Sequence, residues 1–235
     1  MRVLTYNLDK DSADRSDAIK VIRNSQPDVI LFQEASSEWQ STLRWHLAGE
    51  YPYISFNQPK IGYDGMGIMS KFPIVEETWL PGANGGWFPA QLAKLQTPMG
   101  QVQLLNVHLR PPSSDTGNKL TGYFTTGPVR KREIAGLHSH LKQSCPTLVI
   151  GDFNEGDDGG AVGWLGKNGF IDALPQFDRK TTTWQGEFKG LHFSERADHV
   201  LYTHDLTCFE AKVIPEGSSD HDPVLAVLGL QPQTR

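Results

Sequence analysis

Short apolar runs typical of β-strands recur along the whole chain, and this alternation limits the folds open to it. In the first part, the strand-like runs MRVLTYNL and PDVILFQE are each followed by a helical pattern, over residues 11–24 and then through Trp39 and Leu47. The runs in the middle follow one another across Gly, Pro and Asn turns without helices between them. We therefore expect the middle strands to pair antiparallel.

The second half of the chain repeats this mixture. A helix is predicted over residues 129–141 after Pro128, and a short helix near 160–168 follows the strand PTLVIGDF. Further strands are predicted at ADHVLYTHD, LTCFEAKVI and DPVLAVLGL. Two sheets packed face to face, with helices outside, would bury all of these runs. The sequence thus predicts an α/β (α+β) sandwich, and its 235 residues are expected to form one domain over 1–235.

The composition excludes several classes of protein. The apolar share of 38% is ordinary, and the net charge of −5 comes without a basic stretch that would bind nucleic acid by charge alone. No run of eighteen apolar residues occurs, and the N-terminus becomes polar after eight residues, too soon for a signal peptide. We expect a cytoplasmic monomer without stable membrane association, in which Cys145 and Cys208 are reduced.

Several strand-like runs end in polar residues that do not belong in a core. Each of these residues alone is more compatible with a turn or a helix cap than with a functional site. Together they would carry a large desolvation cost beside apolar strands, which pairing or a metal ion offsets. Because ligands bind at strand ends in α/β sheets, we expect one site that gathers Asn7, Glu34, His108, Asp152, Asn154, Asp198, Asp220 and His221.

The residue types in this set favour metal-assisted hydrolysis of a phosphate ester. Carboxylates without cysteines suit Mg²⁺ or Mn²⁺, and Glu34 is the best single ligand candidate. Histidines paired with acids suit proton transfer near neutral pH, and asparagine amides can orient water or a substrate oxygen.

The order of these motifs resembles that of the endonuclease/exonuclease/phosphatase superfamily, which has the deoxyribonuclease I-like fold. The resemblance covers nearly the whole chain and rests on the ordered motifs TYNLD, LFQE, GIMS, NVHL, GDFN, RADHV and SDHDP. It implies a four-layered α/β/β/α sandwich of two packed mixed sheets, with the site at one edge of the paired sheets.

The resemblance also implies a metal-binding part of the site. Glu34 would be the main Mg²⁺ or Mn²⁺ ligand, Asp9 a second acid near the ion, and Asp220 a residue that helps to organise it. Asn7 would position Asp9 and bind an oxygen of the substrate phosphate.

The catalytic part implied by the resemblance surrounds the attacked phosphate. Asp152 and Asn154 would orient or deprotonate the attacking water, and His221, held by Asp198, would contact the scissile phosphate. His108 would donate to the phosphate as negative charge develops. Whether Asp152 or His221 accepts the proton of the water stays open. His199, next to Asp198, is interpreted as a packing residue rather than as a third histidine of the site.

The substrate is less constrained than the chemistry. In the superfamily, the histidine of the NVHL motif disfavours abasic-site repair enzymes, and Arg110 beside the long loop 111–128, with its Tyr123 and Phe124, favours a nucleic acid. We expect an endo- or exonuclease acting on DNA. The alternatives are a lipid, inositol-phosphate or phosphotyrosyl enzyme of the same fold, for which the pair Trp87 and Phe88 could contact lipid, and a non-catalytic binding module.

Overall fold

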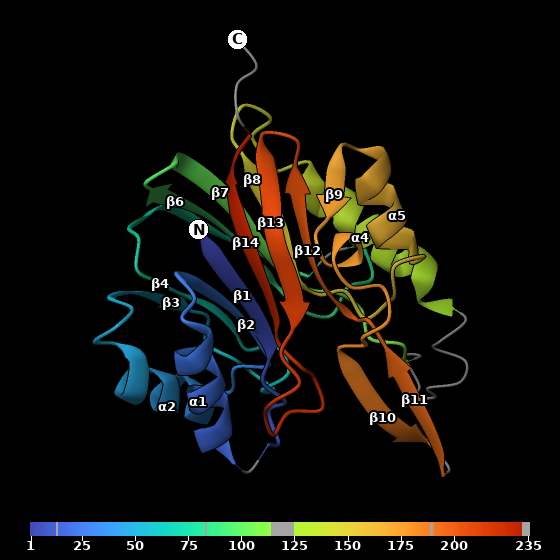
Figure 1. The fold of residues 1–235 in the computed structure, drawn as a ribbon. Helices are drawn as coiled ribbons and strands as arrows, with labels where there is room; N and C mark the ends of the chain where they lie inside the picture. The colour runs from blue at the N-terminus through green and yellow to red at the C-terminus, as the bar shows by residue number, and fades with distance from the viewer. Residues whose placement is uncertain (13, 83, 114–124, 189, 232–235) are drawn as a thin grey trace.

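Two mixed β-sheets of six strands each lie face to face, with helices on the outer surface of each sheet (Figure 1). The computed structural model describes residues 1–235 apart from 13, 83, 114–124, 189 and 232–235. The loop aromatics Tyr123 and Phe124 lie outside the described residues. The four-layered α/β/β/α sandwich predicted from the sequence is confirmed.

The first sheet combines both ends of the chain. Across this sheet, the strands are β13 (Leu206–Val213), β14 (Val224–Leu230), β1 (Arg2–Asn7), β2 (Val29–Gln33), β4 (Met66–Ser70) and β3 (Tyr53–Phe56). Strands β1 and β2 run parallel, and the other neighbours are antiparallel. Its outer face is covered by α1 (Arg15–Ser25) and α2 (Ser37–Leu47), whose first turns are capped by the side chains of Asp14 and Ser36.

The second sheet is built from the middle of the chain. Its strands, in order, are β5 (Ile74–Leu80), β6 (Ala90–Thr97), β7 (Gly100–His108), β8 (Thr147–Asp152), β12 (Asp198–Thr203) and β9 (Phe170–Asp172). Only β7 and β8 run parallel, so the predicted antiparallel pairing of the middle strands is confirmed. Its outer face carries α4 (Gly127–His138) and α5 (Gly160–Lys167), close to the predicted ranges, and the short 3-10 helix η1 (Leu174–Gln176) follows β9.

The apolar side chains fill three layers. Leu31 and Leu104 belong to the layer between the sheets, Trp39 lies between α2 and the first sheet, and Ile134 lies between α4 and the second sheet. Each fully buried side chain of this kind contributes about 1.5–3 kcal/mol to the hydrophobic stabilisation. Alternating strand residues thus explain why apolar runs from distant parts of the chain meet.

Buried side-chain amides near the ends of β2 and β7 form hydrogen bonds that connect the two sheets. The Gln33 side-chain amide donates to Asn106 Oδ1 at 2.7 Å, and Asn106 Nδ2 lies 3.3 Å from the Phe32 carbonyl oxygen and 3.2 Å from that of Gly67. Because unpaired buried amides are costly, these hydrogen bonds favour one alignment of the sheets.

A hairpin of β10 (Trp184–Phe188) and β11 (Leu191–Glu195) projects from the sandwich and was missed by the sequence analysis (Figure 1). Trp184 forms an isolated bridge with His221, and the amide of Gln185 donates to the Asp220 carbonyl. The hairpin base is therefore joined to the segment that carries the SDH motif.

Candidate active site

The carboxyl ends of the two parallel strand pairs bring polar side chains from both sheets together. Asn7 ends β1, Glu34 follows β2, and His108 and Asp152 end β7 and β8. Asn7 Nδ2 donates to Asp152 Oδ2 at 3.0 Å and lies 3.4 Å from Glu34 Oε1. His108 Nε2 lies 3.5 Å from Asp152 Oδ2 and 4.0 Å from Glu34 Oε1. The convergence predicted for these strand ends is present in the structure.

Asp152 lies in the middle of this group, and the GDFN motif fixes its carboxylate. The backbone N–H of Asn154 donates to Oδ1 at 2.8 Å, and Asn154 Nδ2 lies 3.3 Å from Oδ2 and 3.1 Å from the Leu109 carbonyl. Gly151 has a φ of 141°, and a Cβ there would lie 2.0 Å from the Val107 carbonyl oxygen. Only glycine fits at position 151, because the backbone of β7 lies too close to leave room for a side chain.

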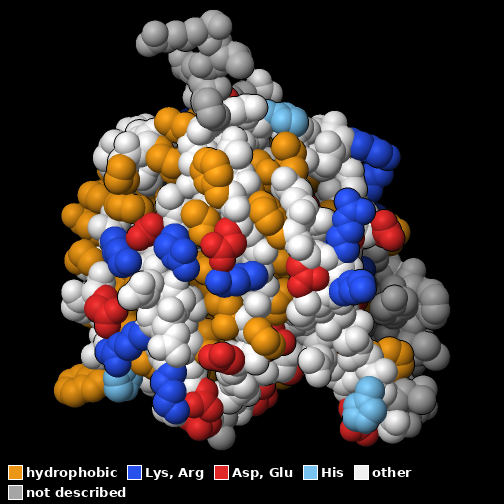
Figure 2. All heavy atoms as spheres, viewed as in Figure 1, with side chains coloured by type: hydrophobic (Ala, Val, Ile, Leu, Met, Phe, Trp, Pro, Cys, Tyr) orange, Lys and Arg blue, Asp and Glu red, His pale blue; other side chains and the backbone are white. Residues whose placement is uncertain are grey.

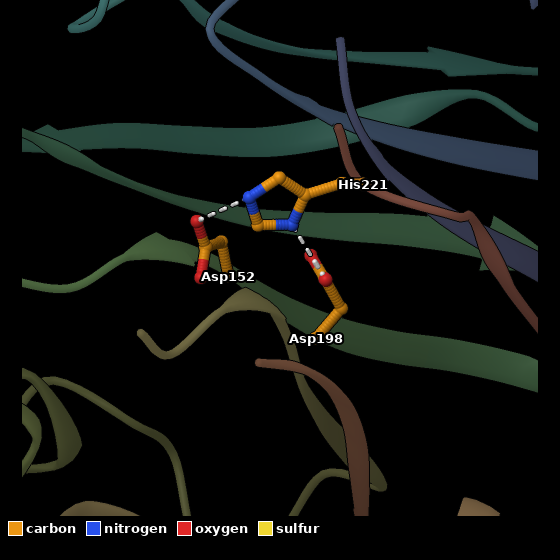
Figure 3. Close-up of side chains that lie close together, drawn as sticks. All are labelled: Asp152, Asp198 and His221. Atoms are coloured by element: carbon orange, nitrogen blue, oxygen red, sulfur yellow. Dashed lines mark hydrogen bonds and ion pairs between the residues drawn. The ribbon is translucent and has the colours of Figure 1, made fainter. Parts of the chain in front are cut away.

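His221 and Asp198 form a buried pair on the other side of Asp152 (Figure 3). His221 Nδ1 lies 2.8 Å from Asp198 Oδ2, and its Nε2 lies 3.8 Å from Asp152 Oδ2. Asp198 stands opposite Asp152 in the antiparallel ladder of β12 and β8, which sets this spacing. Burial lowers the pKa of His221, but the charges of Asp198 and Asp152 outweigh it and raise the pKa to about 10. The imidazole is therefore charged at neutral pH, and Nδ1 donates to Asp198.

The carboxylate of Glu34 lies in a strongly acidic environment. Burial, together with the charge of Asp152, raises the pKa of Glu34 to about 7. Hydrogen bonds from the Lys10 backbone N–H and from Asn7 lower this pKa, but by less than burial raises it. Burial also raises the pKa of Asp9, and nearby Asp220 adds to the shift. Among the described residues, no lysine or arginine forms an ion pair with Glu34 or Asp152. A divalent cation would offset this excess of negative charge, so the residues present fit a metal ion.

Backbone strain is concentrated at the same place. Of the non-glycine residues with positive φ in the described part of the chain, three belong to the candidate site: Asp9 at 48°, Glu34 at 55° and Asn154 at 52°. Left-handed backbone is uncommon for glutamate, and strained residues cluster at functional sites. All three residues follow the end of a strand, so the left-handed positions coincide with the strand ends that form the site.

Asp220 lies at the exposed margin of the site. Its Oδ2 accepts a hydrogen bond from Trp184 Nε1 at 3.0 Å. The neighbouring Ser219 Oγ donates to the Asn7 carbonyl at 2.8 Å, which ties the SDH segment to the end of β1. Trp184 is a site-bordering residue that the sequence analysis missed, because its contact depends on the projecting hairpin.

His108 is packed differently from His221. Burial lowers the pKa of His108, so its ring is neutral at neutral pH. The ring stacks on Phe88, with the ring centroids 4.1 Å apart and an interplanar angle of 25°. Phe88, interpreted from the sequence only as part of an apolar pair with Trp87, therefore orients one of the two histidines of the site.

The Arg110 side chain lies against the loop before β6. Its guanidinium donates to the carbonyls of Gly85 and Ser113, at 3.0 and 3.1 Å, and lies over the Trp87 ring. The contact of Arg110 with substrate thus stays a prediction.

His199 points to the opposite face of β12, as expected for the residue next to Asp198 in a strand. Its Nδ1 lies 2.7 Å from Asp172 Oδ2 and its Nε2 lies 3.0 Å from the Glu155 carbonyl oxygen. His199 therefore lies on the face of β12 away from Asp152 and His221, where its ligand atom lies within 4.8 Å of those of Asp157 and Asp172.

This histidine predicts a pH dependence of stability. Burial lowers the pKa of His199, but Asp172 and the Glu155 carbonyl outweigh it and raise the pKa to about 9. Because the pKa of His199 is higher in the folded protein than in the unfolded chain, the charged ring stabilises the folded state. This contribution is complete at pH values below the unfolded pKa and is lost as the pH rises through the folded pKa of about 9. In urea unfolding, the stability advantage of wild type over Asp172→Asn should be largest near pH 6.5 and shrink by pH 9.5. A difference that is constant across this range would contradict the charged pair.

The visible surface carries mixed charges, with lysine and arginine side chains interspersed among acidic ones rather than gathered in one field (Figure 2). This agrees with the absence of a basic stretch in the sequence. Within the described residues, none of the helices is long and apolar enough to cross a membrane.

The chain is similar to known proteins over nearly its whole length. The model of the Endonuclease/Exonuclease/phosphatase family matches residues 4–221. A search of curated proteins found no match. Among solved structures, an endonuclease/exonuclease/phosphatase from Beutenbergia cavernae DSM 12333 is 20% identical, with a TM-score of 0.79 over 98% of this chain and 71% of the other.

Two further structures share the fold. TDP2 from D. rerio, complexed with single-stranded DNA product, is 15% identical, with a TM-score of 0.78 over 97% of this chain and 98% of that one. The catalytic domain of human Nocturnin with a bound sulfate anion is 14% identical, with a TM-score of 0.71 over 98% of this chain and 94% of the other. At these identities the comparison shows the fold alone.

Proposed function

Because the chain belongs to the endonuclease/exonuclease/phosphatase family, we propose that it is a metal-dependent phosphodiesterase that cleaves nucleic acid, with DNA as its substrate. The observation that carries this proposal is the position of Asp152, within 4 Å of Asn7, His108 and His221 at the edge shared by both sheets. A phosphate bound at this edge would meet a carboxylate, a charged imidazole and amide donors together.

The ionisation of the two central groups supports a role for each of them in this proposal. His221 is charged at neutral pH and so donates to a phosphate oxygen rather than accepting a proton from water. Asp152 is buried, and its raised pKa makes it a better base than an ordinary aspartate. Asp152 therefore takes the proton of the attacking water, with Asn154 holding its carboxylate in place.

Donors on the other side stabilise the charge that develops on the phosphate. His108 and Asn7 project from different sheets toward the same carboxylate, so each can donate to a phosphate oxygen without rearrangement of a strand. Fixed donors of this kind cost little reorganisation during the reaction.

Glu34, Asp9 and Asp220 would hold Mg²⁺ or Mn²⁺ at the acidic side of the site. When bound, the ion would polarise a phosphate oxygen and neutralise negative charge. The ligand atoms of Asp152, Asp198 and His221 also lie within 4.8 Å of one another. A second group, Asp157, Asp172 and His199, has the same spacing. The charged ring of His221 disfavours a cation beside it, and the excess negative charge around Glu34 supports Glu34 as the main ligand.

Nucleic acid is the substrate class that the related folds favour, since TDP2 was solved with a single-stranded DNA product. Phe88 is buried against His108, so the apolar pair expected for a lipid enzyme is not exposed as a unit. Burial of Asp152, His108 and His221 in one group carries a large desolvation cost. A binding module without activity would not need this arrangement.

The test is nicking of supercoiled plasmid in Mg²⁺, Mn²⁺ or EDTA, with His221→Ala purified in parallel as a contamination control. Nicking that needs metal and is lost in the variant would support the proposal. Cleavage of a chromogenic phosphodiester without nicking would point to another leaving group, and no cleavage of either substrate would overturn the phosphodiesterase assignment.

Glu34→Gln should raise the Mg²⁺ concentration needed for half-maximal nicking by at least about 10-fold, because a neutral amide binds a hard cation more weakly. A second measurement does not depend on activity. Mg²⁺ should raise the Tm of the wild-type protein, since it binds only the folded state, and should raise that of Glu34→Gln much less. Equal Tm shifts in the two proteins would remove Glu34 from the ligand set.

A further inference from the structure

Trp87 and Phe88 are neighbours in sequence but lie in opposite environments. Phe88 is 7% exposed and stacks on His108, whereas Trp87 is 44% exposed. Their rings meet edge to face, with centroids 6.4 Å apart. Two ring contacts thus lead from the candidate catalytic histidine His108 to a large aromatic surface that is open to solvent.

One face of the Trp87 ring is already occupied. The guanidinium carbon of Arg110 lies 3.7 Å from the ring centroid, which is a close cation–π contact. Arg110 is 5% exposed, and its guanidinium is fixed by the carbonyls of Gly85 and Ser113. Because this face is covered, the exposed area of Trp87 belongs to the opposite face and the rim.

The loop that carries Trp87 is seated tightly on α4. A Cβ at Gly86 would lie 1.9 Å from Glu133 Oε1, and Gly85 has a φ of 94°. Glu133 is itself held, since its Oε2 accepts from the Arg110 amide at 3.0 Å. Asn84 Nδ2 donates to the Arg132 carbonyl at 3.3 Å. The two glycines allow this approach, so the ring is held before any ligand arrives.

We propose that Trp87 is a stacking platform for a nucleobase of the nucleotide next to the scissile phosphate. This inference rests on the proposed function and names the part of the substrate that the site recognises besides phosphate. Nucleobases are planar groups held close to each phosphate of a strand, and stacking on tryptophan tolerates any base. The net charge of −5 offers little general attraction for a polyanion, so stacking would supply affinity that charge does not.

The experiment compares two single strands of equal length and charge, a labelled deoxythymidine 10-mer and a 10-mer of abasic nucleotides. Binding is measured by fluorescence anisotropy in EDTA, so no turnover is needed. Trp87→Ala should weaken binding of the base-containing strand by about 10- to 100-fold and leave binding of the abasic strand unchanged. Trp87→Phe should restore part of the loss. Trp45→Ala, which removes a tryptophan that is 85% exposed on α2, is the matched control and should bind both strands like wild type.

The outcomes separate this inference from the proposed function. Equal Kd values for wild type and Trp87→Ala on the base-containing strand, or no binding of that strand by wild type, would overturn the platform whatever the enzyme hydrolyses. If Trp87→Ala weakens binding of both strands alike, the ring does not read the base, and the inference also fails. Hydrolysis of bis(p-nitrophenyl) phosphate with Mg²⁺ or Mn²⁺ is measured alongside, and its absence counts against the phosphodiesterase alone.

Discussion

Asp152→Asn is expected to lower kcat for phosphodiester cleavage by about 10³- to 10⁴-fold, since it removes the group that accepts the proton of the attacking water. The substituted amide has nearly the same shape, but both carboxylate oxygens of Asp152 accept hydrogen bonds, so the new NH2 group would face donors of Asn7 or Asn154 and lose their hydrogen bonds. Burial already raises the pKa of Asp152, which means that the folded protein disfavours the charged form. Removal of this buried charge should offset part of the cost of the lost hydrogen bonds, so the variant should stay folded with a Tm somewhat below that of wild type.

Asp158→Asn is the matched control for this substitution. Asp158 is an exposed acid in the same loop, after the GDFN motif, and has no part in the proposed chemistry. Its rate should equal that of wild type. Single-turnover measurements at saturating metal separate the chemical step from product release. A rate for Asp152→Asn within about 10-fold of wild type would exclude Asp152 as the base, because general-base catalysis typically contributes 10² or more.

The convergence of polar residues at the strand ends was predictable, because parallel strands bring their carboxyl ends to the same edge of a sheet. Asn7, His108 and Asp152 each end an apolar run, and the parallel pairs β1–β2 and β7–β8 bring such ends to one edge. A polar residue after a buried strand is visible in the sequence without knowledge of the partner strand. The sequence therefore predicted the members of the group, and their distances had to come from the packing of the two sheets.

The hairpin β10–β11 could not be predicted in the same way. Its strands WQGEF and LHFSE alternate apolar and polar residues, a signal that the sequence analysis missed. They form a two-stranded sheet of their own, however, so the pattern does not show that the hairpin borders the site. Trp184 reaches the site through contacts with Asp220 and His221, which lie more than thirty residues later in the chain. The stacking of Phe88 on His108 also joins separate strands and loops of the chain, and nothing in the local sequence distinguishes Phe88 from Trp87.

The two neighbouring residues Asp198 and His199 show what strand periodicity does decide. Both are buried in β12, but alternate strand residues face opposite sides. Asp198 therefore meets His221 in the site, and His199 meets Asp172 on the other face of β12. When one of two neighbouring strand residues is known to face a helix layer, strand periodicity predicts that the other faces the opposite side, here the side of the candidate site.

His221→Ala is expected to lower kcat by about 10³-fold or more, because it removes the charged donor that faces the phosphate. It should also lower the Tm. Asp198 is buried, and loss of its partner leaves a carboxylate without a counter-charge, a change that costs about 3–5 kcal/mol. Loss of activity in this variant alone would thus mix a catalytic effect with a structural one.

The double variant Asp198→Asn, His221→Ala separates the two effects. Removal of the buried charge should restore much of the Tm, while kcat should stay as low as in His221→Ala alone, because Asp198 acts only by holding the His221 ring. Asp198→Asn by itself should lower kcat by about 10²-fold, since a neutral partner no longer holds the ring in its charged form. If the losses of the two single variants multiply in the double variant, Asp198 contributes to the reaction independently of His221. Recovery of kcat together with the Tm would instead show that His221 stabilises the fold and takes no part in the chemistry.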